Sequence, residues 1–320
     1  MGLSPDELSA RVRKGDPRAV ARAISLVEDG APAARELVGQ LHRHGGRAFV
    51  VGVTGAPGSG KSTLVDQLVA TVRGAQLTVA VVAVDPSSPF TGGAVLGDRV
   101  RMGRHSDDPG VFVRSMATRG HLGGLSQATA DAVAVLDAAG RDVILVETVG
   151  VGQDEVEIMR LAAVTILLLV PGTGDDVQAL KAGVMEIADV FVINKADRPD
   201  ADRLMEAVES SLALRQAGAG EWQPPVLKTE AVRGVGVEAV WAAVGRCREH
   251  RGVHDRAGRE RERWASRLRD SVARRAGVLV AERIPADDWA RIVSEVMARD
   301  IDADAAADRL LARAFSGRGQ

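Results

Sequence analysis

The hydrophobic residues in the middle of the chain fall into short runs that do not alternate with polar residues. These runs are Phe49–Val53, Leu77–Val84, Val111–Val113, Val143–Val146, Val164–Val170 and Val190–Ile193. Segments with helical periodicity separate them, at Ser62–Val72, Ser126–Ala139 and Val177–Ala188. Strands without alternation are buried on both faces, and their alternation with helices is typical of a parallel sheet covered by helices. The pattern therefore predicts an α/β fold.

The two ends of the chain differ from this middle part. Residues 1–46 read as helices with breaks at glycine and proline, and we expect them to form an N-terminal helical extension. Residues 47–252 carry the strand runs, with a last short strand at Val226–Leu227 and a helix at Val237–Arg248. Residues 253–320 are predicted to be helical, at Arg256–Ala276, Ala286–Arg299 and Ala303–Phe315. This tail is too small for a large core of its own, so we expect it to pack on the sheet domain or on another subunit.

Composition and charge exclude several classes of protein. The 320 residues carry a net charge of −2, which disfavours a protein that coats nucleic acid. Cys247 is the one cysteine, so the sequence excludes an internal disulfide framework and a multi-cysteine metal site. No apolar run approaches the roughly 20 residues that span a bilayer, and the first residues lack a signal-peptide pattern. We therefore expect a cytoplasmic protein without a membrane partner.

A phosphate-binding loop follows the first predicted strand. Residues 55–62, GAPGSGKS, match the pattern G-x4-G-K-[ST] directly before a predicted helix. Glycines let successive backbone N–H groups point at phosphate oxygens, and the helix N-terminus adds positive potential. Lys61 is expected to reach the β- and γ-phosphates, and the Ser62 hydroxyl to bind Mg²⁺. The predicted nucleotide-binding residues of the loop are Gly58, Ser59, Gly60, Lys61, Ser62 and Thr63.

A second motif points to the base. Asn194, Lys195 and Asp197 form N-K-x-D directly after the run Val190–Ile193. A carboxylate can accept hydrogen bonds from N1–H and from the 2-amino group of guanine. Adenine lacks the 2-amino group and has an acceptor at N1, so it would leave the carboxylate unpaired. The motif therefore favours GTP and GDP over adenine nucleotides.

Two acids end predicted strands, where ligands of parallel sheets gather. Asp85 follows one run, and Glu147 opens Glu147–Gly150, the place of the D-x-x-G element that holds Mg²⁺ and senses the γ-phosphate. Many small GTPases place a glutamine directly after this glycine to orient water, but here that residue is Val151, and the nearest glutamine is Gln153. Slow intrinsic hydrolysis is expected.

Together these residues resemble a known family. The motifs that carry the resemblance are DPSS at 85–88, GG at 92–93, LGDR at 96–99, RM at 101–102, TRGHLGG at 118–124, ETVGVGQ at 147–153, PGTGDDVQ at 171–178 and NKAD at 194–197. They are similar to those of the MeaB/ArgK family, called MMAA in animals. The resemblance implies a SIMIBI-class P-loop GTPase with an N-terminal helical extension and a C-terminal helical dimerisation arm. It also implies binding of GTP and Mg²⁺, and a chaperone role toward methylmalonyl-CoA mutase, an adenosylcobalamin enzyme, in which the GTPase gates cofactor loading and protects the mutase.

The resemblance also assigns roles to single residues. It places Asp85, Asp98 and Glu147 in the metal site with Ser62, and Lys61, Glu147 and Lys181 in catalysis. It assigns switch roles to Gly150, Gln153, Asp175 and Gln178. Ala231 falls in the base-contacting loop, where Glu230 departs from the family's usual Ser-Ala-like sequence.

Other readings remain open from the residues alone. A metallochaperone GTPase of the hydrogenase or urease type would need a nickel or zinc site, which six scattered histidines and one cysteine disfavour. A small-molecule kinase would prefer ATP, and a scaffold would not hydrolyse GTP at all. The identity of the client acyl-CoA mutase is open as well. The segment Arg246–Arg275, with eleven arginines and five acids, is expected to face solvent, the mutase or a second subunit.

Overall fold

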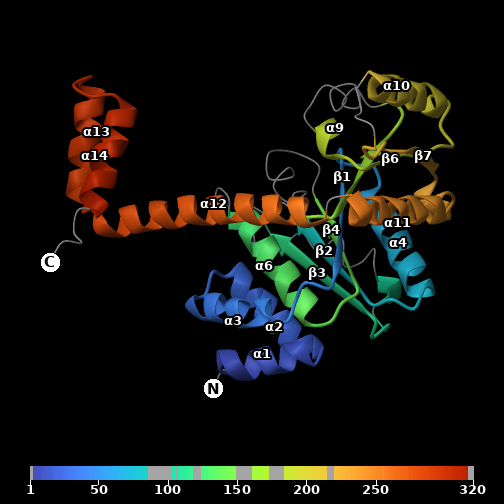
Figure 1. Cartoon of the computed structure of the whole chain (residues 1–320), viewed down its shortest axis with the longest axis horizontal. Coiled ribbons are helices and arrows are strands. Elements are labelled where there is room, and N and C mark those ends of the chain that lie inside the picture. The colour runs from blue at the N-terminus through green and yellow to red at the C-terminus, as the bar shows by residue number, and fades with distance from the viewer. Residues whose placement is uncertain are drawn as a thin grey trace. The chain divides into compact units, whose positions relative to one another are not determined.

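The computed structural model describes residues 3–85, 103–105, 107–117, 124–148, 161–172, 184–214, 220–254 and 256–315. The chain forms two compact units, Met1–His254 and Asp255–Gln320. The first unit carries the sheet, and the second is helical (Figure 1). No helix in the described part of the chain is both long and apolar enough to cross a membrane.

Seven parallel strands form the sheet of the first unit, in the order β3-β2-β4-β1-β5-β6-β7. They are β1 (Phe49–Gly55), β2 (Val79–Asp85), β3 (Val111–Ala117), β4 (Val143–Glu147), β5 (Val164–Leu169), β6 (Val190–Asn194) and β7 (Val226–Thr229). This confirms the predicted α/β class with a parallel sheet. Because all strands run the same way, their carboxyl ends meet at one edge, where Gly55, Glu147 and Asn194 lie.

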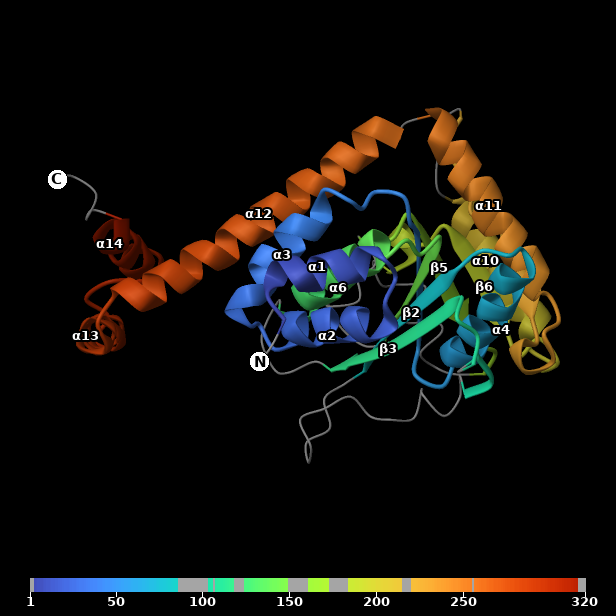
Figure 2. The same ribbon diagram turned by 90° about the horizontal axis from the view of Figure 1, so that it is seen from below.

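Helices cover both faces of the sheet, with α1–α3 and α6 on one side and α4 and α11 on the other (Figures 1 and 2). The helices of this unit are α1 (Pro5–Arg13), α2 (Pro17–Glu28), α3 (Pro32–His42), α4 (Lys61–Gly74), α6 (Gly124–Ala138), α9 (Val184–Ile187), α10 (Ala201–Ala213) and α11 (Val237–His254), with 3-10 turns η1 (Gly103–His105) and η2 (Ala231–Arg233). Capping residues at their N-termini determine where the first two helices begin. Ser4 and Glu7 form a capping box before α1, and the Asp16 carboxylate caps α2.

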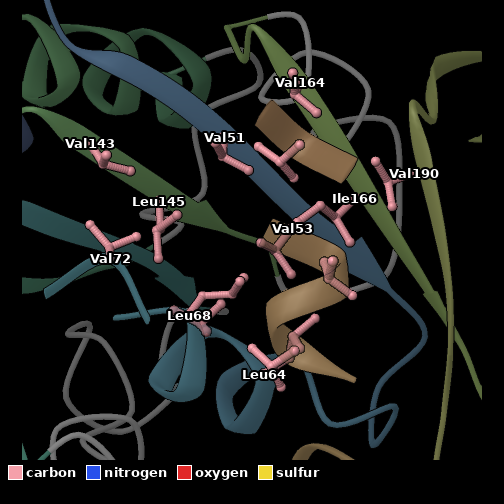
Figure 3. Packing of buried hydrophobic residues seen from close by; sticks show 14 of the residues in the cluster. Val51, Val53, Leu64, Leu68, Val72, Val143, Leu145, Val164, Ile166 and Val190 are labelled. Atoms are coloured by element: carbon pink, nitrogen blue, oxygen red, sulfur yellow. The ribbon is translucent and has the colours of Figure 1, made fainter. Parts of the chain in front are cut away.

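The core is divided by the sheet, because successive side chains of each strand point to opposite faces. On one face, Val53, Leu145 and Ile166 pack against α4 and α11. Leu64, Leu68 and Val72 repeat every four residues along α4 and lie against these strands (Figure 3). On the other face, the alternate residues of β2 and β4 pack against α1–α3 and α6. The alternate residues of β5 and β6 on that face pack against α9 and α10. Burial on both faces explains why the strand sequences do not alternate.

The second unit consists of α12 (Arg256–Arg283), α13 (Ala286–Met297) and α14 (Ala303–Phe315). The prediction that the first of these helices ends at Ala276 was wrong: the helix continues through Gly277 and ends just before Pro285, which cannot continue it. Where the helices meet, a small core forms from Val280, Ile284, Ile292, Ala306, Leu310 and Ala314. Large apolar side chains stay exposed along α12, at Leu268, Val272 and Leu279.

Candidate nucleotide-binding site

The loop from Gly55 to Ser62 joins β1 to α4 and depends on its glycines. Gly55, Gly58 and Gly60 have φ angles of 147°, 76° and 94°, in the left-handed half of the map that other residues rarely adopt. A Cβ on Gly55 would clash with the Leu168 carbonyl oxygen, and one on Gly60 with the Asn194 side chain. Gly60 is also the N-cap residue of α4, so the first N–H groups of that helix face the loop. The backbone thus forms a cradle of the kind that binds phosphate.

Lys61 and Ser59 lie buried at this cradle. The Lys61 side chain is 7% exposed, and its Nζ donates to the carbonyl oxygens of Gly55 at 2.8 Å and Ala56 at 3.1 Å. These contacts hold the ammonium group close to the loop backbone. The buried Ser59 Oγ has no hydrogen-bond partner among the described residues. An unsatisfied buried hydroxyl is costly, and a phosphate oxygen at the loop would satisfy it.

A hydroxyl and a carboxylate meet beside the loop. Ser62, in the first turn of α4, donates from Oγ to Oε1 of Glu147 at 2.6 Å. Both side chains are buried, and Glu147 is level with Val53 of β1 in the sheet register. The next residue, Thr148, donates from its hydroxyl to that of Thr54 at 3.0 Å. Hydroxyl and carboxylate oxygens are ligands that Mg²⁺ prefers, so the Ser62–Glu147 pair fits this ion.

The N-K-A-D segment lies against the same loop. Asn194 donates from Nδ2 to the Ser59 carbonyl oxygen at 2.8 Å, and Lys195 donates from Nζ to the Gly58 carbonyl oxygen at 2.8 Å. Lys195 has a φ of 57°, which turns the chain sharply after β6. Asp197 is exposed. The phosphate loop and the base motif, which are distant in the sequence, are thus joined directly.

The turn η2 completes this arrangement. Oδ1 of Asn194 accepts from the Thr229 hydroxyl at 3.0 Å and from the Ala231 N–H at 3.1 Å. Glu230, the departure from the family sequence, forms an ion pair with Arg233 at 2.9 Å. The Glu230 side chain is therefore engaged within its own turn, and the Ala231 backbone contacts Asn194.

Several predicted site residues lie outside the described residues. They are Asp98, Gly150, Gln153, Asp175, Gln178 and Lys181. Asp85 ends β2 at the same sheet edge as Glu147, but its side chain is also outside the description. Thr63 is half-buried in the first turn of α4. The roles predicted for these residues stay predictions.

One interaction near the site was not foreseen from the sequence. Asp66 on α4, one turn after Ser62, pairs with Arg104 at 2.6 Å and with His105 at 3.1 Å. This cluster joins the phosphate-loop helix to the segment that precedes β3. The partners are 38 and 39 residues apart, and no local pattern signals the pairing.

Among the residues with described positions, no group of three or more His, Cys, Asp or Glu side chains is placed to hold a metal ion. Cys247 is buried in the core of the first unit. The described part of the chain therefore offers no cysteine- or histidine-built site of the kind that nickel or zinc chaperones require.

Comparison with known proteins agrees with this geometry. Residues 20–288 match the family described as "Methylmalonyl Co-A mutase-associated GTPase MeaB". A protein of Pyrococcus abyssi is 48% identical over 98% of this chain and 97% of its own length. "GTPase ArgK" of Escherichia coli is 41% identical over 73% of each chain. A crystal structure titled "LAO/AO transport system kinase" superposes with a TM-score of 0.72 at 27% identity, covering 96% of each chain.

Proposed function

The chain belongs to the MeaB family of GTPases, and from this membership we propose that it is a cytoplasmic chaperone of an adenosylcobalamin-dependent acyl-CoA mutase. In this proposal GTP hydrolysis gates loading of the mutase cofactor and protects the mutase from inactivation, and methylmalonyl-CoA mutase is the first client to test. The family description, which names that mutase, supports this partner. The observation that carries the nucleotide part is the direct bond from Asn194 to the phosphate loop.

The phosphate end of GTP would lie in the cradle of Gly58, Ser59 and Gly60. Lys61 and the N–H groups at the start of α4 would then stabilise negative charge that develops on the γ-phosphoryl group. Ser62 and Glu147 would hold Mg²⁺, with Asp85 and Asp98 as further acids. When bound, Mg²⁺ neutralises charge on the β- and γ-phosphate oxygens.

Asp197 would recognise the guanine base of GTP. Its exposed carboxylate is free to accept from N1–H and the 2-amino group of guanine, while Lys195 packs against the loop that holds the phosphates. Asn194 supports both the base site and the phosphate site, because it bonds to η2 and to the phosphate loop. Ala231 would lie beside the base through its backbone.

The output of the cycle would be a change in the switch residues Gly150, Gln153, Asp175 and Gln178. Because Val151 stands where many GTPases have a water-orienting glutamine, intrinsic hydrolysis would be slow. Contact with the mutase would accelerate it, with Lys181 as the candidate for completing the catalytic site.

The chain would act as a homodimer through its C-terminal helices. Leu268, Val272 and Leu279 are 65%, 59% and 37% exposed. Spacings of four and eleven residues place all three on one face of α12. An apolar stripe on a long charged helix is the usual surface of helix–helix association.

The proposal is tested by measuring GTP and ATP hydrolysis with Mg²⁺, alone and with apo- or holo-methylmalonyl-CoA mutase. We expect slow, GTP-selective turnover that rises with the mutase, and cofactor loading that depends on GTP. GTP-selective turnover that no acyl-CoA mutase alters would overturn the chaperone role and keep the GTPase. ATP preference would overturn the role of Asp197.

A further inference from the structure

A cavity of about 370 Å³ lies at the amino-terminal ends of the strands, on the opposite side of the sheet from the phosphate loop at their carboxyl ends. It lies beside Val143, the first residue of β4, which is level with Phe49 at the start of β1. β1 has seven residues and is therefore roughly 20 Å long. The cavity, at the start of this strand, thus lies about that far from Gly55 at the phosphate loop. Cavities of roughly 300–1,000 Å³ are typical of small-molecule sites. The volume is thus sufficient for a ligand of metabolite size.

The lining of this cavity is strongly basic. Four arginines and a histidine contribute to it, against two aspartates; the basic residues are Arg13, His44, Arg47, Arg141 and Arg248. Both aspartates already serve the backbone. Asp137 accepts from the N–H groups of residues 46–48, and Asp142 from that of Thr78. Positive charge therefore predominates in the lining, and both of its aspartates are engaged with backbone N–H groups.

Arg141 is the most unusual of these residues. It is 7% exposed, and Nη1 donates to the Pro109 carbonyl oxygen at 3.3 Å. Its Nε is buried and has no hydrogen-bond partner among the residues with described positions. Burial lowers the pKa of this guanidinium. An anion in the cavity would compensate part of the poorly solvated charge of the Arg141 guanidinium.

The other part of the lining is apolar. Leu77, Val143 and the half-buried Trp241 contribute to it. Arg248, another lining residue, lies over the ring of Phe49, 4.5 Å from its centroid, and this contact restrains the guanidinium. A ligand with both an anionic group and an apolar ring matches this division.

We propose that the cavity binds a small organic phosphate, with its phosphate group against Arg47 and Arg141 and its apolar part against Trp241 and Leu77. Guanidinium groups match phosphate oxygens in a two-point geometry, which favours phosphate where several arginines converge. The site is concave, and this favours a small molecule over an acidic segment of another protein.

The test uses the full-length protein saturated with GDP and Mg²⁺, so that the phosphate loop is occupied. Phenyl phosphate, which carries one phosphate and one aromatic ring, is titrated by calorimetry at low ionic strength. We expect one further binding site, weakened at least tenfold in the double variant Arg13→Gln/Arg47→Gln. Both arginines are exposed, so the variant should fold.

The matched control is Arg35→Gln/Arg43→Gln, which removes the same two charges from exposed residues outside the lining. Affinity within twofold of the wild type is expected there. Absence of saturable binding, or equal weakening in the control, overturns the proposal. Binding of an acidic peptide in place of phenyl phosphate would overturn it as well.

Discussion

The side-chain amide of Asn194 donates a 2.8 Å hydrogen bond to the carbonyl oxygen of Ser59. This bond joins the end of β6 to the phosphate loop, across 135 residues of sequence. The same side chain accepts from Thr229 and from the Ala231 N–H. One amide therefore holds together the loop for the phosphates and the turn next to the base.

Replacement of this amide should affect both stability and binding. In Asn194→Ala, the buried Ala231 N–H and the Thr229 hydroxyl lose their partner. We expect the free energy of unfolding to fall by about 2–6 kcal/mol, because each of the two unsatisfied buried polar groups costs about 1–3 kcal/mol. GTP affinity should fall at least about tenfold, which corresponds to roughly 1.4 kcal/mol. Urea denaturation and nucleotide titration measure the two effects.

The control for this variant is Thr229→Val, which keeps the shape and removes one of the three bonds. It should cost about 1 kcal/mol of stability, the usual worth of one hydrogen bond. GTP affinity should stay close to that of the wild type. Normal GTP affinity in Asn194→Ala would contradict the bridging role.

Most of the fold could be predicted from local patterns in the sequence. The strands at β4, β5 and β6 are buried on both faces, so their composition alone distinguishes them from amphipathic strands. The phosphate loop is contiguous, and its glycines meet backbone requirements set within a few residues. Such features depend on neighbours in sequence and are readable from it.

Other features depend on partners that the sequence does not bring together. The Asn194–Ser59 bond and the Asp66–Arg104 ion pair join segments whose separation carries no periodic signal. The basic cavity draws residues from α1, α6 and α11, and only the parallel sheet places those elements at one edge. The N-K-x-D motif predicted that guanine would be bound. Only the structure shows that this motif is hydrogen-bonded to the phosphate loop.

The 2.6 Å contact between Ser62 and Glu147 predicts the outcome of a conservative replacement. Glu147→Gln keeps an oxygen that can accept from Ser62 but removes the charge that would attract Mg²⁺. We expect GTP turnover to fall about a hundredfold, the scale of losing one charge-stabilising group, and the Mg²⁺ concentration at half-maximal rate to rise. Steady-state assays over a Mg²⁺ series measure both.

Thr54→Val is the control for this site. It removes the buried hydroxyl that faces Thr148 and leaves the Ser62–Glu147 pair in place. Stability should fall by about 1 kcal/mol, while the Mg²⁺ dependence stays unchanged. An unchanged Mg²⁺ dependence in Glu147→Gln would remove this residue from the metal site.

Base specificity should follow the chemistry of residue 197. Asp197→Asn places one donor and one acceptor where two acceptors stood, which mismatches guanine and matches the N1–H and 2-oxo groups of xanthine. We expect GTP affinity to fall and XTP affinity to rise, each by about tenfold or more, as buried hydrogen-bond mismatches discriminate strongly. Asp200→Asn changes another exposed acid nearby and should alter neither affinity. Equal GTP binding by both variants would contradict base recognition by Asp197.

The apolar stripe of α12 predicts the oligomeric state. Leu268→Asp/Val272→Asp places two charges on the stripe, and burying unpaired charges at an interface is strongly unfavourable. We expect a dimer for the wild type and a monomer for this variant, by light scattering after size exclusion. Ala273→Asp adds an exposed charge to the next residue of the helix, off the stripe, and should remain dimeric. A dimeric double variant would place the interface elsewhere.

The last prediction concerns acid stability. Asp142 accepts from the Thr78 N–H at 2.8 Å and from the Thr78 hydroxyl at 2.7 Å. These hydrogen bonds, first that from the backbone, lower the pKa of the Asp142 carboxyl in the folded protein. The folded state therefore binds this proton less readily than the unfolded state, whose Asp pKa is about 3.9. The resulting stabilisation is complete above that value and is lost as the pH falls through the lower, folded pKa.

Asp142→Asn should therefore be less stable than the wild type at pH 7, and the difference should shrink below about pH 4, near the unfolded pKa. Urea denaturation of both proteins at several pH values from 7 down to about 2 measures this difference, because the loss occurs below the unfolded pKa. Asp107→Asn, a change at an exposed carboxylate, serves as the control, and its difference from the wild type should stay small throughout. A constant difference between Asp142→Asn and wild type across this range would show that Asp142 contributes through packing and not through its charge.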